Sequence, residues 1–163
     1  MKFINIKKND KVGIVAHDAG ASNLIKAWAQ NQKNVKFYFC LKGPAINIFK
    51  DELLKNNNLS IEYLIENCNL LITGTSYISS HEHLARVKAK NSKILSIAVI
   101  DHWVNYKLRF IRNKNLVLPE NIWVFDEFAE EKAKKVFEQT TIERKRNFYI
   151  ENLVIKIKTL EDK

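Results

Sequence analysis

Three short polar segments each follow an apolar run and carry side chains suited to acid–base chemistry or anion binding. They span residues 17–23, 73–76 and 101–109. His17 and Asp101 are the candidates for a catalytic base and acid, because their surroundings can tune an imidazole or a carboxylate to transfer protons near neutral pH. The remaining polar and glycine positions are candidates for ligand binding. The expected ligand-binding residues are Asp18, Gly20, Ser22, Asn23, Gly74, Thr75, Ser76, His102, Asn105, Tyr106 and Arg109.

Each catalytic candidate lies next to a potential partner, in the pairs His17-Asp18 and Asp101-His102. A carboxylate that contacts an imidazole fixes its tautomer and raises its basicity. Adjacent residues of an extended segment point to opposite sides of the chain, so we expect each imidazole to pair with the Asp of the other segment. The alternative is structural, with both Asp residues capping turns and both imidazoles bonded to backbone carbonyls.

Glycines mark the places where a ligand could approach the backbone. Three of the four glycines, Gly20, Gly43 and Gly74, lie between an apolar run and a helix-like stretch. Glycine allows sharp turns and close approach, and a helix amino terminus offers unpaired N–H groups to an anion. Neither the Gly20 segment nor the Gly74 segment is a Walker loop or a complete Gly-x-Gly-x-x-Gly. Ser22 is equally suited to capping a helix and to binding a phosphate.

A metal site is suggested only by the sequence His81-Glu82-His83. Residues two apart on a helix do not share a face, unlike the four-residue spacing of zinc-binding helices. We therefore expect no metal, and a first helical turn that faces solvent. Nothing in the sequence indicates a cofactor. Cys40 and Cys68 lie beside apolar stretches without a Cys-x-x-Cys spacing, which predicts buried free thiols in a reducing compartment.

Elements that could position these residues alternate along the chain. Apolar runs predict strands at 12–16, 35–40, 70–73, 95–100 and 122–125. Helical spacing of apolar residues predicts helices at 22–30, from 44 to the Asn56-Asn57-Asn58 stop, at 60–65 with Ser60 as cap, at 80–90 and from 127 onward. This order predicts an α/β fold: an open, mostly parallel, five- or six-stranded Rossmann-like sheet with helices on both faces. Its strand ends would bring the three polar segments to one edge.

The 163 residues are expected to form a single domain with its core at about 11–140. Segment 103–120 shows no long helical periodicity, and a loop of that length inside a domain is often functional. The tail at 141–163 has no clear pattern, and its segment Leu153-Val154-Ile155-Lys156-Ile157 fits a strand, a docking helix or a partner-binding segment.

The formal net charge of +9 is the one unusual feature of the composition. Basic clusters at 7–8, 132–135 and 144–146 could meet anionic lipid headgroups or a phosphorylated substrate. Nucleic acid is not expected, because zinc-finger spacing and the stacking aromatics of RNA-binding modules are missing from the sequence. No apolar run approaches the roughly 20 residues that span a bilayer, and the start lacks a secretory signal pattern. These features predict a cytoplasmic protein.

Four segments carry a resemblance to a known family. They are Val15-Ala16-His17-Asp18-Ala19-Gly20-Ala21, Ile72-Thr73-Gly74-Thr75-Ser76, the stretch 100–110 and the stretch 118–127. In this order they resemble the amino-terminal domain of two-domain, GT-B type glycosyltransferase-like proteins of bacterial surface-polysaccharide biosynthesis. The resemblance spans about residues 11–150. Its most distinctive part, Asp-His-Trp-x-Asn-Tyr-x-x-Arg-Phe at 101–110, identifies a lineage rather than a reaction.

The resemblance implies a domain that binds a sugar, a sugar phosphate or a nucleotide sugar. In such transferases the nucleotide-sugar donor binds largely to a second, carboxy-terminal Rossmann domain. Split transferases exist in which the amino-terminal half takes a lipid-linked acceptor. The implied partner is therefore a second transferase subunit, with a homo-oligomer as the other option, and the implied location includes peripheral contact with the anionic inner face of the membrane.

Two other functions remain open at this stage. One is a standalone small hydrolase or isomerase that uses His17 and Asp101 as acid and base. The other is a non-catalytic adaptor whose basic tail at 141–163 recruits a partner.

Overall fold

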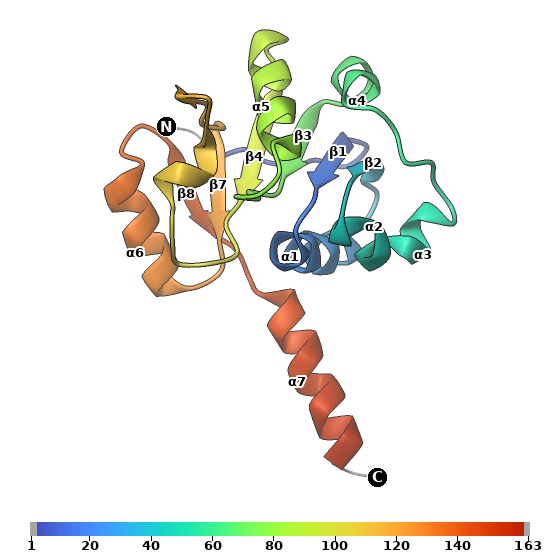
Figure 1. Cartoon of the computed structure of the whole chain (residues 1–163). Coiled ribbons are helices and arrows are strands. Elements are labelled where there is room, and N and C mark those ends of the chain that lie inside the picture. The colour runs from blue at the N-terminus through green and yellow to red at the C-terminus, as the bar shows by residue number, and fades with distance from the viewer. Residues whose placement is uncertain (1–2, 162–163) are drawn as a thin grey trace.

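A six-stranded parallel sheet forms the centre of the computed structural model, which describes residues 3–161 (Figure 1). All strands except the edge strand at 141–144 are short runs of mostly apolar residues, and the central strands are buried between two layers of helices. The strands are β1 (Lys11–Ala16), β2 (Lys36–Leu41), β3 (Leu70–Thr73), β4 (Leu95–Val99), β7 (Asn121–Val124) and β8 (Thr141–Arg144). The predicted open, parallel Rossmann-like sheet is confirmed, with six strands.

The strand order is β2-β1-β3-β4-β7-β8, and all neighbouring pairs are parallel. The chain moves outward from β1 to β2 and then returns past β1 to β3. It thus reverses direction between β1 and β3, and ligands of open α/β sheets bind in the crevice outside the carboxyl ends of the strands at such a reversal. The segments that follow β1 and β3 are therefore the structurally favoured ligand-binding loops.

Helices cover both faces of the sheet, as predicted. They are α1 (Ala19–Gln30), α2 (Pro44–Ile48), α3 (Lys50–Leu53), α4 (Ile61–Asn67), α5 (His81–Asn91), α6 (Glu127–Val136) and α7 (Phe148–Glu161). Val12 and Ile14 of β1 pack on the α1 side, while Val15 packs on the α4–α5 side. A third cluster joins β4 and β7 to α6. The alternation of strand side chains between faces explains why the strands read as continuous apolar runs.

Several boundaries differ from the predicted ones. The helix expected from residue 44 onward is broken at Phe49, whose backbone leaves the helical region while its ring is buried against Phe39, 5.5 Å away. Ser60 caps α4 as predicted, and its hydroxyl accepts a hydrogen bond from the Tyr63 amide.

The long segment between β4 and β7 is more regular than its sequence suggested. It contains a short 3-10 helix, η1 (Lys107–Phe110), and a hairpin of β5 (Ile111–Arg112) and β6 (Asn115–Leu116). Asn113 and Lys114 form the turn with positive φ angles, which matches the twist of a tight two-residue hairpin.

The tail consists of a strand and a helix. β8 adds to the sheet edge beside β7, and α7 then runs away from the body of the domain (Figure 1). Phe148 and Tyr149 at its start pack against the α1 side of the core. Within residues 3–161, no helix combines the length and the apolar character that crossing a bilayer requires.

Candidate functional site

Arg109 joins two of the three polar segments at the carboxyl edge of the sheet. One guanidinium nitrogen, Nη1, donates to Asp101 Oδ1 at 2.9 Å and to the Thr75 backbone and hydroxyl oxygens at 3.2 and 3.3 Å. The Arg109 and Asp101 side chains are only 11% and 19% exposed, so their ion pair is held in a partly desolvated setting. The loops that leave β3 and β4 therefore form one connected unit.

Gly20 brings the loop after β1 to the same unit. A Cβ atom at Gly20 would lie 1.9 Å from Asp101 Oδ2, so the carboxylate occupies the space that only glycine leaves open. Gly20 was expected to let a ligand approach the backbone, and in the structure the group that lies against it is the Asp101 carboxylate. The segments after β1 and β4 thus meet at Asp101, and Arg109 links the loop after β3 to them.

His17 pairs with its own neighbour. Its ring Nδ1 lies 2.6 Å from Asp18 Oδ1, with the two side chains 23% and 33% exposed. The prediction that each His would pair with the Asp of the other segment is wrong, because Asp101 is already engaged by Arg109. Asp18 stands at the N-cap of α1 without a side-chain capping bond, which leaves its carboxylate free to hold the imidazole.

The hydroxyl groups of this edge mainly fix its loops. Thr75 donates to the Val99 carbonyl at 2.8 Å, and Ser22 donates to the Asp18 carbonyl at 2.6 Å. Ser76 accepts from the amides of Ile78 and Ser79. These three residues are buried. Gly74 is buried too, and a Cβ there would lie 2.7 Å from Glu82 Oε1.

The other expected ligand-binding residues occupy varied surroundings. Asn23 is half-buried on α1, and His102 is exposed beside Asp101. Asn105 is exposed with a φ of 59°, and its carbonyl accepts from the Arg109 amide, so it shapes the turn that precedes η1. Tyr106 is 3% exposed and stacks on Phe137 in the α6 cluster, with its hydroxyl donating to the Ala129 carbonyl. Burial raises the pKa of Tyr106 to about 12.

The start of α5 is buried, which corrects the expectation of a turn that faces solvent. His81, Glu82 and His83 are 6%, 1% and 6% exposed. Glu82 Oε1 accepts from the His17 amide at 2.9 Å, whereas Glu82 Oε2 has no partner in the described part of the chain. Burial raises the pKa of the Glu82 carboxyl. This turn therefore belongs to the polar cluster beneath the β1 and β3 loops.

Arg86 also belongs to this polar cluster, and the sequence analysis did not identify it as a site residue. It is 1% exposed and donates to the Thr73 hydroxyl and the Gly74 carbonyl, both at 3.0 Å. A signal was present in the sequence, because Ala85 and Ala89 mark the helix face that packs on the sheet, and Glu82 and Arg86 lie on the same side. Among residues 3–161, no group of three or more His, Cys, Asp or Glu side chains is placed to hold a metal ion.

A cavity of about 510 Å³ opens beside Asp101, at the carboxyl ends of β4 and β7. Its polar wall is formed by Asp101, His102, Asp126 and Asn147, and its aromatic wall by Trp103, Phe125 and Tyr149. The Trp103 indole N–H donates to Asp126 Oδ2 at 3.0 Å, so the ring is held in place although it is 51% exposed.

This combination suits a small polar ligand with an apolar face. Aromatic rings provide contact area, while carboxylate and amide oxygens accept hydrogen bonds from hydroxyl groups. A sugar ring has both kinds of surface, since C–H groups line its faces and hydroxyls its rim. A search of the whole chain against known protein families found no matching family, and a search among curated proteins found no match either.

Proposed function

We propose that this domain binds a sugar, a sugar phosphate or a nucleotide sugar in a glycosyltransferase system of bacterial surface-polysaccharide biosynthesis. The observation that carries the proposal is the cavity at the carboxyl end of β4, where Asp101 and Asn147 face aromatic residues. The resemblance of segments 15–21, 72–76, 100–110 and 118–127 to the amino-terminal domain of such transferases supplies the biological setting.

Asp101 has the central binding role in this proposal. Its Oδ1 accepts a hydrogen bond from Arg109 Nη1 at 2.9 Å, and this ion pair fixes the orientation of the carboxylate. Asp101 also lines the cavity, where it would accept hydrogen bonds from sugar hydroxyls. Trp103 would stack on the apolar face of the ring, and Asn147 would bond to its rim.

The direct test is ligand binding to single variants. UDP-glucose, UDP-N-acetylglucosamine, glucose 1-phosphate and free monosaccharides are titrated by calorimetry and by the shift in melting temperature. Trp103→Ala removes the stacking surface and should weaken binding about tenfold, which corresponds to about 1.4 kcal/mol. Asp101→Asn keeps the shape but removes the charge, and should abolish the shift.

Leu108→Ala is the matched control. Leu108 is a similarly exposed apolar residue on η1 and is not part of the cavity wall. Its replacement should leave the affinity unchanged. No binding across the panel, or equal losses in Trp103→Ala and Leu108→Ala, would reject the proposed site.

One observation favours the standalone hydrolase or isomerase as a second candidate. His17 Nδ1 is held at 2.6 Å by Asp18, an arrangement that leaves Nε2 as a general base. In this alternative Asp18, rather than Asp101, is the partner of His17. A bell-shaped pH profile of turnover that disappears in His17→Ala would support it, and unchanged turnover in that variant would end it.

Association with a second copy forms part of the proposal. Ile150, Leu153, Ile157 and Leu160 form what we call the α7 row, with alternating spacings of three and four residues. All four are more than a third exposed. This spacing lets identical helices pack side by side around a twofold axis. The net charge of +9 suits an anionic acceptor at the inner face of the membrane.

A further inference from the structure

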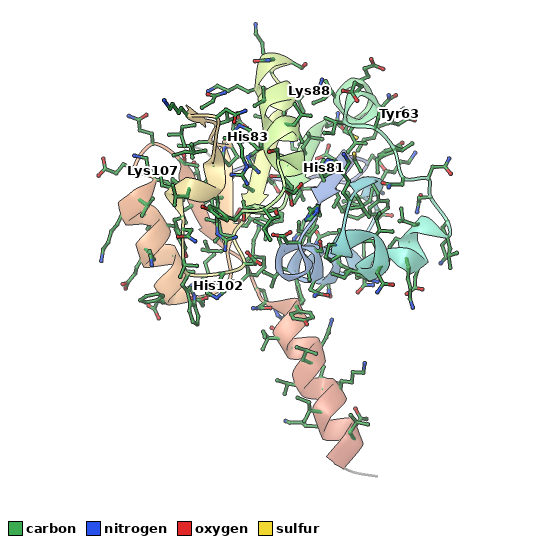
Figure 2. The ribbon with its side chains drawn as sticks, in the orientation of Figure 1. Tyr63, His81, His83, Lys88, His102 and Lys107 are labelled. Atoms are coloured by element: carbon green, nitrogen blue, oxygen red, sulfur yellow. The ribbon has the colours of Figure 1, made fainter. Side chains whose placement is uncertain are left out.

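A second and larger cavity lies on the other side of the sheet edge. Its volume is about 760 Å³, and it opens at the carboxyl end of β2 on the face covered by α4 and α5. Lys42, the first turn of α5 with His81 and His83, and Arg112 of the hairpin line it. Figure 2 shows both histidines at the base of α5, well apart from His102, which belongs to the first cavity. The two cavities share no lining residue.

Positive charge dominates the wall of this cavity. Lys42 is exposed at the end of β2 and forms no ion pair within the described residues. Arg112 donates to the carbonyls of Ser76, Tyr77 and Ser79, so it adds charge and rigidity rather than free donors. The carboxylate at the rim, Glu62, is paired with Lys88 at 2.9 Å.

His83 lines the cavity and has a buried ring nitrogen that forms no hydrogen bond within residues 3–161. Its side chain is 6% exposed, and the nitrogen without a partner is Nδ1. Burial, together with the charges of Arg86 and Arg112, lowers the pKa of His83 to about 4, so the ring is neutral at physiological pH. His81 differs, because its Nε2 already contacts the Cys40 carbonyl at 3.0 Å. Leaving a buried polar atom unsatisfied costs free energy, which a bound acceptor would recover.

The amino terminus of α5 adds a further attraction for an anion. This helix has eleven residues, and its N-cap, Ser80, makes no side-chain capping bond. The partial positive charge at the start of a helix favours anionic groups near its first turn. The first turn therefore adds its dipole to the charges of Lys42 and Arg112 at the same wall.

We propose that this cavity is a binding site for a phosphate-bearing small molecule. The phosphate would be contacted by Lys42, by the His83 ring and by the first turn of α5, with the charge of Arg112 behind it. The site is distinct from the cavity beside Asp101, and it stands whether or not that cavity binds a sugar.

The test uses inorganic phosphate and pyrophosphate at an ionic strength held constant with sodium chloride. Histidine ring resonances of the whole protein are followed by ¹H–¹⁵N correlation spectroscopy, and affinity is measured by calorimetry. The His83 signal should shift saturably, while the His102 signal should stay in place. Lys42→Gln and His83→Phe should each weaken binding about tenfold or more. Lys50→Gln, which changes an exposed lysine that is not part of this cavity wall, should have no effect.

Three results would overturn the proposal: no shift of His83 up to millimolar phosphate, equal losses in Lys42→Gln and Lys50→Gln, or a shift of His102 instead. Lys42 is exposed, so its variant keeps the test decisive even if His83→Phe fails to fold. Glucose 1-phosphate and phosphatidic acid vesicles, run on the same variants, distinguish a soluble phosphate ester from a lipid headgroup as the source. The Trp103 variant and its Leu108 control test the sugar site separately, so failure of one proposal leaves the other intact.

Discussion

At the residue scale, Arg86 is the side chain on which the polar edge of the sheet depends. It donates to Thr73 and Gly74 at the end of β3, and to the Arg109 carbonyl in the segment after β4 at 3.4 Å. Its guanidinium also lies 5.0 Å from the centre of the Phe110 ring. Because Arg86 reaches both loops from beneath, it acts as an internal support for the segment that holds Asp101.

Replacing Arg86 by Met should destabilise the fold by about 3 kcal/mol. The change keeps much of the apolar stem but leaves the carbonyls of Gly74 and Arg109 buried without their donor. Urea denaturation gives the free energy of unfolding. Lys90→Met is the matched control on an exposed position of the same helix and should change stability by less than about 0.5 kcal/mol. Equal effects of the two changes would contradict the supporting role.

The buried His83 predicts a specific pH dependence of stability. Its folded pKa, about 4, lies below the ordinary value of 6.5, so the unfolded chain binds the proton more tightly. The contribution of His83 to stability is therefore present above about pH 6.5 and is lost as the pH falls towards 4. Free energies of unfolding measured across this range should fall more steeply for the wild type than for His83→Phe. The exposed His102→Phe should follow the wild type, and a parallel fall in all three would contradict the prediction.

The sequence predicted which segments carry the polar side chains better than it predicted which of those side chains contact each other. The segments that contain His17, Thr75 and Asp101 were identified from their types and their positions after apolar runs. His17 pairs with Asp18 because Arg109 already forms an ion pair with Asp101. Arg86 is buried because the face of α5 that carries it packs against the sheet. Both the partner of His17 and the burial of Arg86 depend on tertiary contacts, which the spacing of residues along the chain does not reveal.

At the scale of elements, the loop after β1 and the loop after β4 fit together only because residue 20 is a glycine. Its missing side chain leaves room for the Asp101 carboxylate, whose Oδ2 would lie 1.9 Å from an added Cβ. Gly20 lies in α1, where alanine would otherwise stabilise the helix by about 1 kcal/mol.

Gly20→Ala should therefore lower the melting temperature and displace Asp101 from Arg109. A double-mutant cycle with Asp101→Ala separates the two causes. The change at residue 20 should be destabilising in the wild-type background and neutral or stabilising once the carboxylate is gone. An equal cost in both backgrounds would show that the contact with Asp101 is not the reason for the glycine.

Five of the six sheet strands could be predicted, because each is an apolar run bounded by turn residues. β8 could not be predicted, since Thr141–Arg144 has only one apolar residue and its last two residues are not buried. The hairpin at β5 and β6 was missed for a similar reason. Its two strands have two residues each, and its turn uses Asn113 and Lys114 rather than a glycine.

At the scale of the whole molecule, the carboxyl edge of the sheet carries two cavities with opposite chemical character. The one beside Asp101 on the α7 side has carboxylates and aromatic rings, and the one beside Lys42 on the α4–α5 side has cations and imidazoles. The loop 73–76 and the ion pair of Asp101 and Arg109 lie at the same edge and connect its strands.

The remaining feature of this scale is the α7 row, carried by a helix that points away from the sheet (Figure 1). Helices of about this length are marginal in water unless a partner covers their apolar face. We expect the wild type to sediment with twice the 19.0 kDa mass of one chain. The double variant Leu153→Ser with Ile157→Ser should sediment as a monomer, because it places two hydroxyls in the centre of the row.

Ile155→Ser is the control that isolates the row from apolar exposure in general. Ile155 is 64% exposed, more than Leu153 or Ile157, yet helical spacing places it on the opposite side of α7. Its replacement should leave the mass of the assembly unchanged. If the wild type sediments at 19.0 kDa at every concentration, pairing through a second copy is wrong. If Ile155→Ser dissociates the assembly as fully as the double variant, the contact is not made by the row, since a twofold packing of α7 buries one side of the helix only.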